Sequence, residues 1–302
     1  MVKNRHSMVR VLVTGSSGFI GMNLCTHLVE EGYEVHGADI EPPEFEHPSS
    51  VEERRVDLLS EPELPDVDVI VHLAAHSQVQ SVVEDSNRAI ENLKMTRHVL
   101  EEAVRMGADV VNASSRDVYG SAIRPSEDEV SPDSPNGYAA SKLGGEALAN
   151  AYAQNHDIRV VSLRLANVYG PKDTNRRVIP IFASRAAAGE KLKVFGEGKL
   201  LDFIHVDDVC DAIVAAMNRI DVADGESFNV GSGDGTPLKD VARMVSEIVD
   251  ECPGWELDED RSGDVSRYVS DNSKANSVLG FEPKKPIEEE LEDTIKWYLD
   301  AR

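Results

Sequence analysis

Apolar and polar positions follow two different rhythms along the first half of the chain. Short runs rich in valine, isoleucine and leucine predict buried parallel strands, and segments with apolar residues three and four positions apart predict amphipathic helices. The expected strands are 9–14, 34–38, 67–73, 109–113 and 159–165, and the expected helices are 22–31, 84–106, 138–156, 206–217, 238–249 and 287–298. Because strands and helices alternate, the pattern predicts an α/β fold with a doubly wound parallel sheet.

A glycine-rich turn connects the first expected strand to the first expected helix. In Gly15-Ser-Ser-Gly18-Phe-Ile-Gly21, the first glycine allows a tight turn, the second lets the backbone approach a pyrophosphate, and the third lets helix and strand pack closely. The diphosphate would lie at the helix N-terminus. The next strand ends in Asp39, about 20 residues on, where a carboxylate binds a ribose diol and repels a 2′-phosphate. This order predicts a Rossmann-type site for NAD rather than NADP, and the alternative is a glycine turn that binds nothing.

Tyr138 and Lys142 lie four residues apart in an alanine-rich helical pattern, so their side chains emerge on the same face of the helix. A tyrosine is normally a poor base because its pKa lies near ~10. A cation at about 5 Å, with an effective dielectric of about 20, would lower that pKa by about 2 units. The pair therefore predicts a general base, Tyr138, that Lys142 activates. The spacing alone is a weak signal, and it gains weight from the nucleotide motif that precedes it.

The chain is strongly acidic, with 31 lysines and arginines against 55 aspartates and glutamates and a formal net charge of −24. Such a surface repels nucleic acid and anionic membranes, which argues against either as a partner. It also repels an anionic nucleotide, so a nucleotide site needs local cations. Adaptation to high salt explains the excess of acid, because screening shrinks to about 3 Å at 1 M. The alternative is an acidic protein with no salt adaptation.

The remaining bulk properties favour a cytoplasmic enzyme. A chain of 302 residues is long enough to bury a full core. Its cysteines are too few and too scattered for a disulfide framework or a metal site, and we expect no metal; they are Cys25, Cys210 and Cys252. No apolar run reaches the roughly 18 residues of a membrane span. Residues 1–7 are basic but lack an apolar core, so they do not predict a signal peptide.

Eight ordered sequence blocks resemble the extended short-chain dehydrogenase/reductase family, in its NAD-dependent epimerase/dehydratase branch, whose members include UDP-glucose 4-epimerase-like enzymes. The blocks are TGSSGFIG from Thr14, HLAA from His72, ASSRDVYG from Ala113, PNGYAASKLGGE from Pro135, RLANVYGP from Arg164, DFIHVDDV from Asp202, FNVGSG from Phe228 and RSGDV from Arg261. They cover nearly the whole chain and are specific for the superfamily, but only moderately specific for the reaction. The resemblance implies a nucleotide domain at 1–173, to which 202–230 returns, and a smaller, interleaved C-terminal substrate-binding lobe from 174–201 and 231–302. It also implies a homodimer, formed through the helices 84–106 and 138–156.

The resemblance also implies roles for single residues. Implied cofactor contacts are Gly15, Gly18, Phe19, Ile20, Gly21, Asp39, Asp57, Leu58, Leu73, Ala74, Ala75, Ser114, Tyr138 and Lys142. Implied substrate contacts are Ser115, Tyr138, Asn167 and Arg261, the last two at the diphosphate. By its register with Tyr119, Ser115 matches the catalytic serine or threonine of the family, which completes a catalytic set with Tyr138 and Lys142. The alternatives are that Asp57 and Leu58 simply end a strand and that Ser115 caps a turn.

The chain departs from the family pattern ahead of Asp202. Many relatives carry an arginine just before this aspartate, whereas this chain has Lys199-Leu-Leu. One cation for the diphosphate is therefore missing, or it is replaced by Lys199, Arg176 or Arg177. His76 and His205 have no companions at metal-ligand spacing, and we expect both to be structural.

The implied reaction is epimerisation of a nucleotide sugar, most simply a UDP-sugar. Tyr138 would remove a proton from the sugar hydroxyl at C4 while hydride passes to NAD and later returns to the opposite face. Sugar 4,6-dehydratases of this family carry Asp-Glu directly after the catalytic serine or threonine, whereas this chain has Arg116-Asp117, and arginine is no proton donor near pH 7. The alternatives are a 4-ketoreductase, a decarboxylase, a 4,6-dehydratase or a noncatalytic NAD-binding protein. The sequence does not choose among UDP-glucose, UDP-N-acetylglucosamine, UDP-glucuronate and dTDP sugars.

Overall fold

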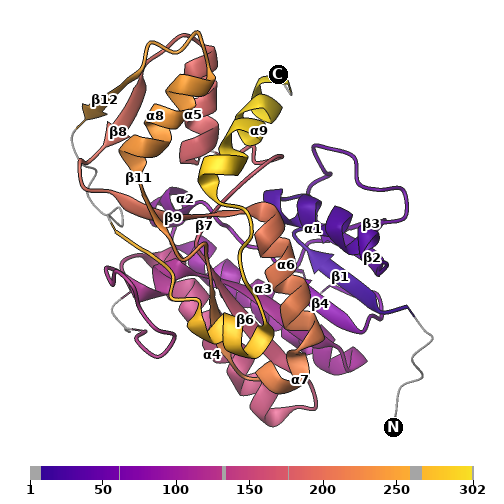
Figure 1. The fold of residues 1–302 in the computed structure, drawn as a ribbon. Helices are drawn as coiled ribbons and strands as arrows, with labels where there is room; N and C mark the ends of the chain where they lie inside the picture. Colours follow the sequence, from indigo (N-terminus) through magenta and orange to yellow (C-terminus); the bar gives the residue numbers. More distant parts are fainter. Residues whose placement is uncertain (1–7, 61, 131–133, 176, 259–266, 301–302) are drawn as a thin grey trace. The chain divides into compact units, whose positions relative to one another are not determined.

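A seven-stranded sheet is the main element of the fold (Figure 1). The computed structural model describes residues 8–60, 62–130, 134–175, 177–258 and 267–300. The strands of the sheet are β1 (Arg10–Thr14), β2 (Glu34–Asp39), β3 (Glu52–Arg55), β4 (Val69–His72), β5 (Asp109–Ser115), β6 (Val160–Leu165) and β10 (Ser227–Val230). Their order is β10-β6-β5-β4-β1-β2-β3, and the pairs from β3 to β5 are parallel. This confirms the predicted doubly wound α/β fold, in which the strand order reverses beside β1.

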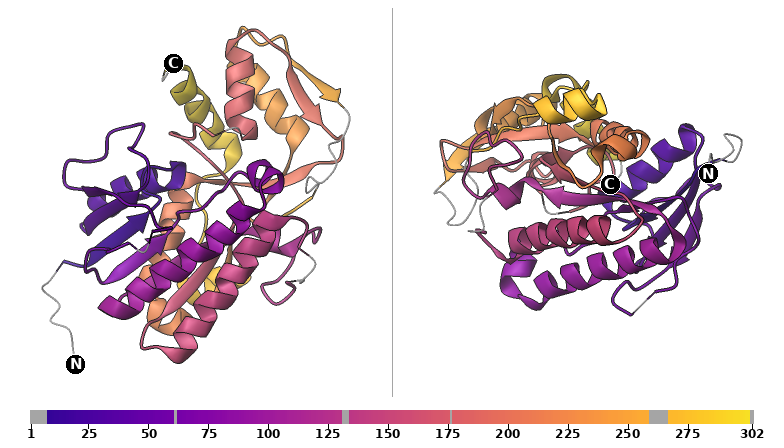
Figure 2. Two further views of the ribbon diagram at one scale, coloured as in Figure 1. Left: turned by 180° about the vertical axis from the view of Figure 1, so that it is seen from behind. Right: turned by 90° about the horizontal axis from the view of Figure 1, so that it is seen from below.

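Helices cover both faces of this sheet. Helices α3 (Asn87–Met106) and α4 (Gly137–Asn155) lie side by side over one face, and α1 (Phe19–Glu30) lies over the other (Figure 2). On the α3 and α4 side, apolar residues of the strands pack against apolar residues of the helices; among them are Leu12, Ile70, Val110, Val99 and Ala149. Burying such side chains contributes roughly 1.5–3 kcal/mol each, which fixes the strand ends that carry the motifs.

The predicted helix at 84–106 is wrong at its start. The chain forms α2 (Val79–Glu84), breaks at Asp85, and begins again at α3. Asp85 has an extended backbone, and its carboxylate accepts a hydrogen bond from the N–H of Asn87 at 3.1 Å. A short polar side chain that bonds the backbone two residues on competes with helix continuation, so the break follows from the chemistry of Asp85.

The chain divides into two compact units, each built from three separate segments. Unit 1 comprises Met1–Ser114, Asn136–Leu163 and Ile213–Ser227, and unit 2 comprises Ser115–Pro135, Arg164–Ala212 and Phe228–Arg302. Unit 1 therefore holds β1 to β4, β5 as far as Ser114, the start of β6, and helices α1 to α4. The division expected from the sequence, 1–173 with 202–230 returning to it, stays a prediction.

Unit 2 adds shorter strands and its own helices. They are η1 (Arg116–Tyr119), β7 (Asn167–Tyr169), α5 (Val178–Ala187), β8 (Leu192–Phe195), β9 (Leu200–His205), β11 (Gly235–Pro237), α8 (Leu238–Ile248), β12 (Trp255–Asp258), η2 (Ala275–Leu279) and α9 (Ile287–Asp300). Strands β11, β9 and β7 form a three-stranded sheet, and β12 pairs with β8. A second core gathers apolar residues of α5, α8 and α9, including Phe182, Val241 and Leu291. Helix α6 (Val206–Asn218) starts in unit 2 and ends in unit 1, where α7 (Ile220–Ala223) follows it. Among the helices of the described residues, none is long and apolar enough to cross a membrane.

Candidate active site

The glycine-rich turn between β1 and α1 forms a tight backbone cradle in unit 1. Gly15 has φ +74°, and a Cβ atom there would lie 2.8 Å from the N atom of Ala74. A Cβ atom on Gly21 would lie 2.1 Å from the carbonyl oxygen of Gly15. Gly18 is the N-cap residue of α1, and no side chain caps this helix end. The turn therefore has room only for glycine at positions 15 and 21, and it leads into a helix N-terminus that no side chain caps, which is the arrangement that binds a diphosphate.

Phe19, Ile20 and Gly21 are the first three residues of α1, and Asp39 is the last residue of β2. The two carboxylate oxygens of Asp39 accept hydrogen bonds at 3.0 Å from the N–H groups of Ser17 and Glu41. The glycine-rich turn thus orients the carboxylate whose ribose contact the sequence predicts. Asp39 is partly exposed, so it keeps acceptor capacity for the hydroxyls of a diol.

The residues after β4 lie against the end of β1. Leu73 N–H donates to the carbonyl of Thr14 at 3.1 Å, and Ala74 N–H donates to the Thr14 hydroxyl at 3.4 Å. Ala75 follows directly. The small residues thus bring the β4 backbone close to Gly15, as expected for a surface that faces the cofactor.

His72, the last residue of β4, is buried beneath this edge. One ring nitrogen lies 2.8 Å from the Thr14 hydroxyl and the other 3.2 Å from the Thr96 hydroxyl. Burial, and next the nearby charge of Lys142, lower the pKa of His72 to about 3. The imidazole is therefore neutral near pH 7, and it adds no second cation beside Lys142.

Asp57 and Leu58 have contacts of their own after β3. An Asp57 carboxylate oxygen accepts a hydrogen bond from Leu59 N–H at 2.9 Å, which shapes the turn that ends the strand. Leu58 is buried in the core, and its carbonyl lies 2.6 Å from Nδ1 of His98. Both contacts fit the structural alternative, and the adenine contact stays a prediction.

Tyr138 and Lys142 lie one turn apart on α4. The helix is capped by Asn136, whose side-chain oxygen accepts a hydrogen bond from Ala139 N–H at 2.9 Å. Tyr138 is 9% exposed, and Lys142 Nζ lies 5.9 Å from the centroid of its ring. Lys142 Nζ also donates to the carbonyl of Ala113 at 2.8 Å. The ammonium is thus held between the phenol ring and the end of β5.

Burial lowers the pKa of Lys142 to about 8, and the charge of Glu146 opposes this effect. Glu146 lies one turn after Lys142 on the same helix and is 3% exposed. Glu146 was not predicted as a site residue, although its spacing of four residues from Lys142 is a signal that the sequence carries. Its carboxylate accepts a hydrogen bond from the Ser114 hydroxyl. The hydrogen of the Ser114 hydroxyl is therefore donated to Glu146. The contact of Ser114 with the cofactor stays a prediction.

Ser115 ends β5 and is the first residue of unit 2. It is 8% exposed, and its hydroxyl oxygen accepts a hydrogen bond from Asp117 N–H at 3.2 Å, which caps the 3₁₀ turn η1. This contact matches the turn-capping alternative. A hydroxyl oxygen that accepts this bond still has its own O–H to donate, so the capping contact is compatible with a role toward substrate.

Arg116 and Asn167 form a polar group in unit 2. Arg116 Nη2 donates to the side-chain oxygen of Asn167 at 3.3 Å, and Arg116 Nε pairs with Asp117 at 3.4 Å. The guanidinium also lies over the Tyr268 ring, 5.5 Å from its centroid. Asn167 donates in turn to the carbonyl of Asp202 at 2.8 Å. Asn167, the predicted diphosphate contact, is therefore hydrogen-bonded to the guanidinium of Arg116, which belongs to the same unit.

The expected replacements for the missing arginine differ in their surroundings. Lys199 is 7% exposed and therefore largely buried in unit 2. Arg177 forms an ion pair with Asp173 at 3.5 Å. Arg176 and Arg261 lie outside the described residues. The identity of the cationic residue that binds the diphosphate stays a prediction.

The two histidines noted in the sequence have acidic neighbours. His76 Nε2 lies 2.8 Å from Glu91, and His205 Nδ1 lies 3.5 Å from Asp207. Within the described part of the chain, no group of three or more histidine, cysteine or acidic side chains could hold a metal ion.

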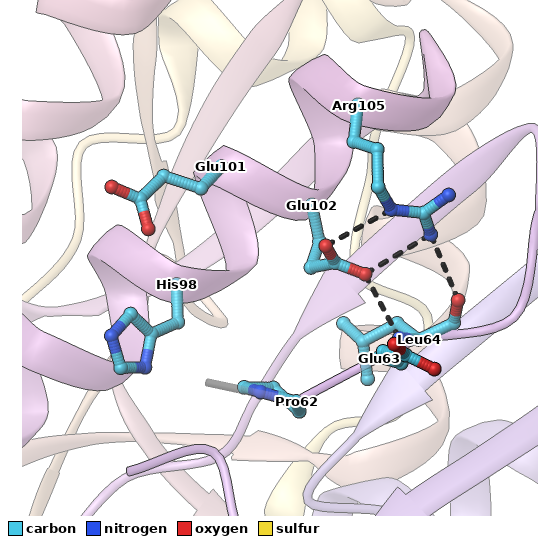
Figure 3. A pocket seen from close by; sticks show the side chains of 7 residues that line it. All are labelled: Pro62, Glu63, Leu64, His98, Glu101, Glu102 and Arg105. Atoms are coloured by element: carbon cyan, nitrogen blue, oxygen red, sulfur yellow. Dashed lines mark hydrogen bonds and ion pairs between the residues drawn. The ribbon is translucent and has the colours of Figure 1, made fainter. Parts of the chain in front are cut away.

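A cavity of about 480 Å³ lies in unit 1 (Figure 3). It is lined by Pro62, Glu63, Leu64, His98, Glu101, Glu102 and Arg105. In this cavity, the Glu102 carboxylate pairs with Arg105 and accepts a hydrogen bond from the N–H of Leu64, so the charge of Glu102 already has a partner. None of its lining residues belongs to the predicted site.

Comparisons with known proteins agree on one family. A sequence model described as the NAD dependent epimerase/dehydratase family matches residues 11–231. A UDP-glucose 4-epimerase from Mycolicibacterium smegmatis is 34% identical over 312 residues, which cover 96% of this chain and 98% of the relative. A dTDP-glucose 4,6-dehydratase from Streptomyces niveus is 34% identical over 244 residues, which cover 78% of this chain and 71% of the relative. The crystal structure of a Thermus thermophilus UDP-glucose 4-epimerase complex with NAD matches with a TM-score of 0.87 at 30% identity, covering 97% of this chain and 100% of that one.

Proposed function

Because the chain belongs to the NAD-dependent epimerase/dehydratase family, we propose that it is a nucleotide-sugar 4-epimerase that acts on a UDP-sugar. The observation that carries this proposal is the arrangement on α4. Tyr138 and Lys142 lie on one face of the helix, and the ammonium is tied to the carbonyl of Ala113 at 2.8 Å. Such a pair is suited to removing a proton from a hydroxyl.

NAD is the cofactor, as it is for the family and for the matched complex. The residues of unit 1 fit it: Gly15 and Gly21 allow a turn too tight for a side chain at either position, this turn leads into a helix N-terminus that no side chain caps, and Asp39 presents an oriented carboxylate. When bound, the nicotinamide accepts the hydrogen and electron pair of a carbinol carbon and later gives them back. The protein residues bind, orient and move the proton.

Tyr138 takes the proton of the sugar hydroxyl at C4 as that carbon is oxidised, and returns it when the carbon is reduced. The positive charge of Lys142 stabilises the phenolate of Tyr138, and its ammonium has further donors for the ribose of the cofactor. Ser115 donates a hydrogen bond to the reacting sugar oxygen. Asn167 and Arg261 contribute to binding of the diphosphate. Because the hydride removed from C4 would return to C4, the cofactor would be regenerated in each cycle.

Arg116 and Asp117 support epimerisation over dehydration. A 4,6-dehydratase needs a proton donor and a base directly after the catalytic serine or threonine. Here the first of these positions holds a guanidinium, which pairs with the carboxylate at the second position at 3.4 Å. An arginine cannot donate a proton near pH 7, so the position that needs a proton donor lacks one. Because the matched relatives include a dehydratase, dehydration is the alternative to test.

The test is a product screen with purified protein and no added cofactor. UDP-glucose, UDP-N-acetylglucosamine, UDP-glucuronate and dTDP-glucose are offered in turn, and products are separated by chromatography. We expect the C4 epimer of one UDP-sugar. A 4-keto-6-deoxy product would indicate a dehydratase, release of carbon dioxide a decarboxylase, and a requirement for stoichiometric NADH a ketoreductase. If no sugar is converted although NAD is bound, the epimerase proposal fails.

We also propose that the acidic surface adapts the enzyme to salt and that it acts as a cytoplasmic homodimer. The formal charge of −24 supports the first part, because self-repulsion weakens as salt screens it. The melting temperature should therefore rise between about 0.1 M and about 1 M KCl. Light scattering under the same conditions measures the assembly. A melting temperature that falls with salt would contradict the adaptation.

A further inference from the structure

We propose that Glu146 is a positioning residue that keeps Lys142 protonated and in place during the reaction. Its catalytic consequence rests on the proposed function, but its effect on Lys142 does not. Glu146 follows Lys142 by one helical turn, as Lys142 follows Tyr138. The three side chains therefore share a face of α4, in the order phenol, ammonium, carboxylate.

The carboxylate of Glu146 sits in a prepared polar site although it is 3% exposed. One oxygen accepts a hydrogen bond from the Ser114 hydroxyl at the end of β5. The other accepts a hydrogen bond from the Ser227 hydroxyl at the start of β10, at 3.2 Å. A carboxylate buried at this depth is costly unless it is hydrogen-bonded or paired with a cation, and here two hydroxyl groups donate hydrogen bonds to it.

The end of β5 binds both the ammonium of Lys142 and the carboxylate of Glu146. The carbonyl of Ala113 accepts a hydrogen bond from the Lys142 ammonium, and the next residue, Ser114, donates to Glu146. Neighbouring residues of one strand thus hold a cation and an anion that are one turn apart on one helix. A shift of α4 along the strand would break both contacts, so the pair fixes the register of the helix that carries Tyr138.

The charges around Lys142 explain why a counterion is needed. Among the residues that the structure describes, the titratable side chains that interact with it are Tyr138 and Glu146 of its own helix and His72 of β4. Burial favours the neutral amine, and the charge of Glu146 opposes that effect. His72 is neutral near pH 7 and contributes no anion. Glu146 is therefore the carboxylate that offsets the desolvation of the ammonium.

The test measures the titration of Lys142 directly. Protein labelled with ¹³C at the lysine ε-carbons and saturated with NAD is titrated by NMR, and the Lys142 signal is assigned by its loss in Lys142→Arg. In Glu146→Gln, which removes the charge and keeps the shape, the titration midpoint should fall by about one pH unit or more. In Glu146→Asp, which keeps the charge, the midpoint should return toward that of the wild type.

Two further measurements separate this role from simple packing. In turnover assays, Glu146→Gln should lose about tenfold in kcat near pH 8, with KM changed less than about twofold, because the loss lies in the protonation of Lys142. Glu102→Gln is the matched control, since Glu102 is a hydrogen-bonded carboxylate of unit 1 that pairs with Arg105. It should leave the Lys142 midpoint and kcat unchanged.

If Glu146→Gln does not fold, a double variant tests whether Glu146 sets the titration midpoint of Lys142. Ser114→Ala with Ser227→Ala removes both hydroxyl groups that hold the Glu146 carboxylate in place and should lower the Lys142 midpoint in the same direction. Ser162→Ala removes a buried hydroxyl that bonds Asn112 and is its control. An unchanged Lys142 midpoint in a folded Glu146→Gln or double variant would overturn the inference. A wild-type protein that converts no nucleotide sugar would refute the proposed function alone, because the titration does not depend on turnover.

Discussion

The Nζ atom of Lys142 lies 2.8 Å from the carbonyl oxygen of Ala113. This hydrogen bond joins α4 to the carboxyl end of β5, the edge at which parallel sheets place their ligands. It leaves the ammonium with further donors and keeps it 5.9 Å from the centre of the Tyr138 ring. The activating cation is therefore tied to the sheet by this hydrogen bond, one helical turn from the proposed base.

Replacing Tyr138 with phenylalanine should reduce kcat by about 10²- to 10⁴-fold while NAD stays bound, because only the proton acceptor is lost. Turnover and cofactor occupancy are measured on the same preparation. Tyr152→Phe, on the same helix and half-buried beside His156, is the control and should keep activity. Full turnover by Tyr138→Phe would show that Tyr138 is not the general base, and only the proposal of a cofactor-binding fold would remain.

Activity should decline as the pH rises through about 8. The pKa of Lys142 in the folded protein lies below its ordinary value of 10.5, at about 8, because burial penalises the cation. Lys142 is protonated below that pH and neutral above it, so stabilisation of the Tyr138 phenolate is lost on the alkaline side. The measurement is kcat from about pH 6 to about pH 10.

Lys142→Arg checks the assignment of that decline. A guanidinium stays protonated across the range, so the variant should be slower but should show no loss between about pH 8 and about pH 10. The same alkaline decline in the variant would show that another group causes it.

Asp39→Asn should weaken binding of NAD by about tenfold and should improve NADP relative to NAD. The change removes the charge that repels a 2′-phosphate and one of the two acceptors that bind Ser17 and Glu41. Affinities of both cofactors are measured by calorimetry on cofactor-free protein. Asp66→Asn, a surface carboxylate that pairs with Arg105, serves as the control. An unchanged ratio of the two affinities would remove Asp39 from cofactor selection.

Gly21→Ala should lower the free energy of unfolding by about 3 kcal/mol, because the new methyl group would lie 2.1 Å from the Gly15 carbonyl oxygen and the backbone must move. Gly198→Ala meets no atom within 4 Å and should be tolerated. Urea denaturation of both variants gives the comparison. Equal stabilities would mean that the cradle between β1 and α1 is looser than described.

The features predicted from sequence are local ones. The step from β1 through Gly15, Gly18 and Gly21 into α1 follows from short-range patterns, and so does the pairing of Tyr138 with Lys142 on α4. Strand β3 escaped prediction because all four of its side chains are charged and exposed at the edge of the sheet, so no apolar pattern marks it.

The surroundings of the site depend on contacts between distant residues. Glu146 is bound by Ser114 and by Ser227, which is 81 residues away, and no spacing in the sequence reveals the second contact. Likewise, the bond of Asn167 to Arg116 joins residues 51 positions apart. These partners meet only because strand order and helix packing bring them together, so they required the structure.

The most direct test of the account follows the hydrogen at the reacting carbon. UDP-glucose carrying deuterium at C4 is incubated with the purified protein without added cofactor, and the product is analysed by NMR and mass spectrometry. The account predicts a C4 epimer that keeps the deuterium at C4, with no such product from Tyr138→Phe. Loss of the deuterium to solvent, or a 4-keto-6-deoxy product, would contradict it.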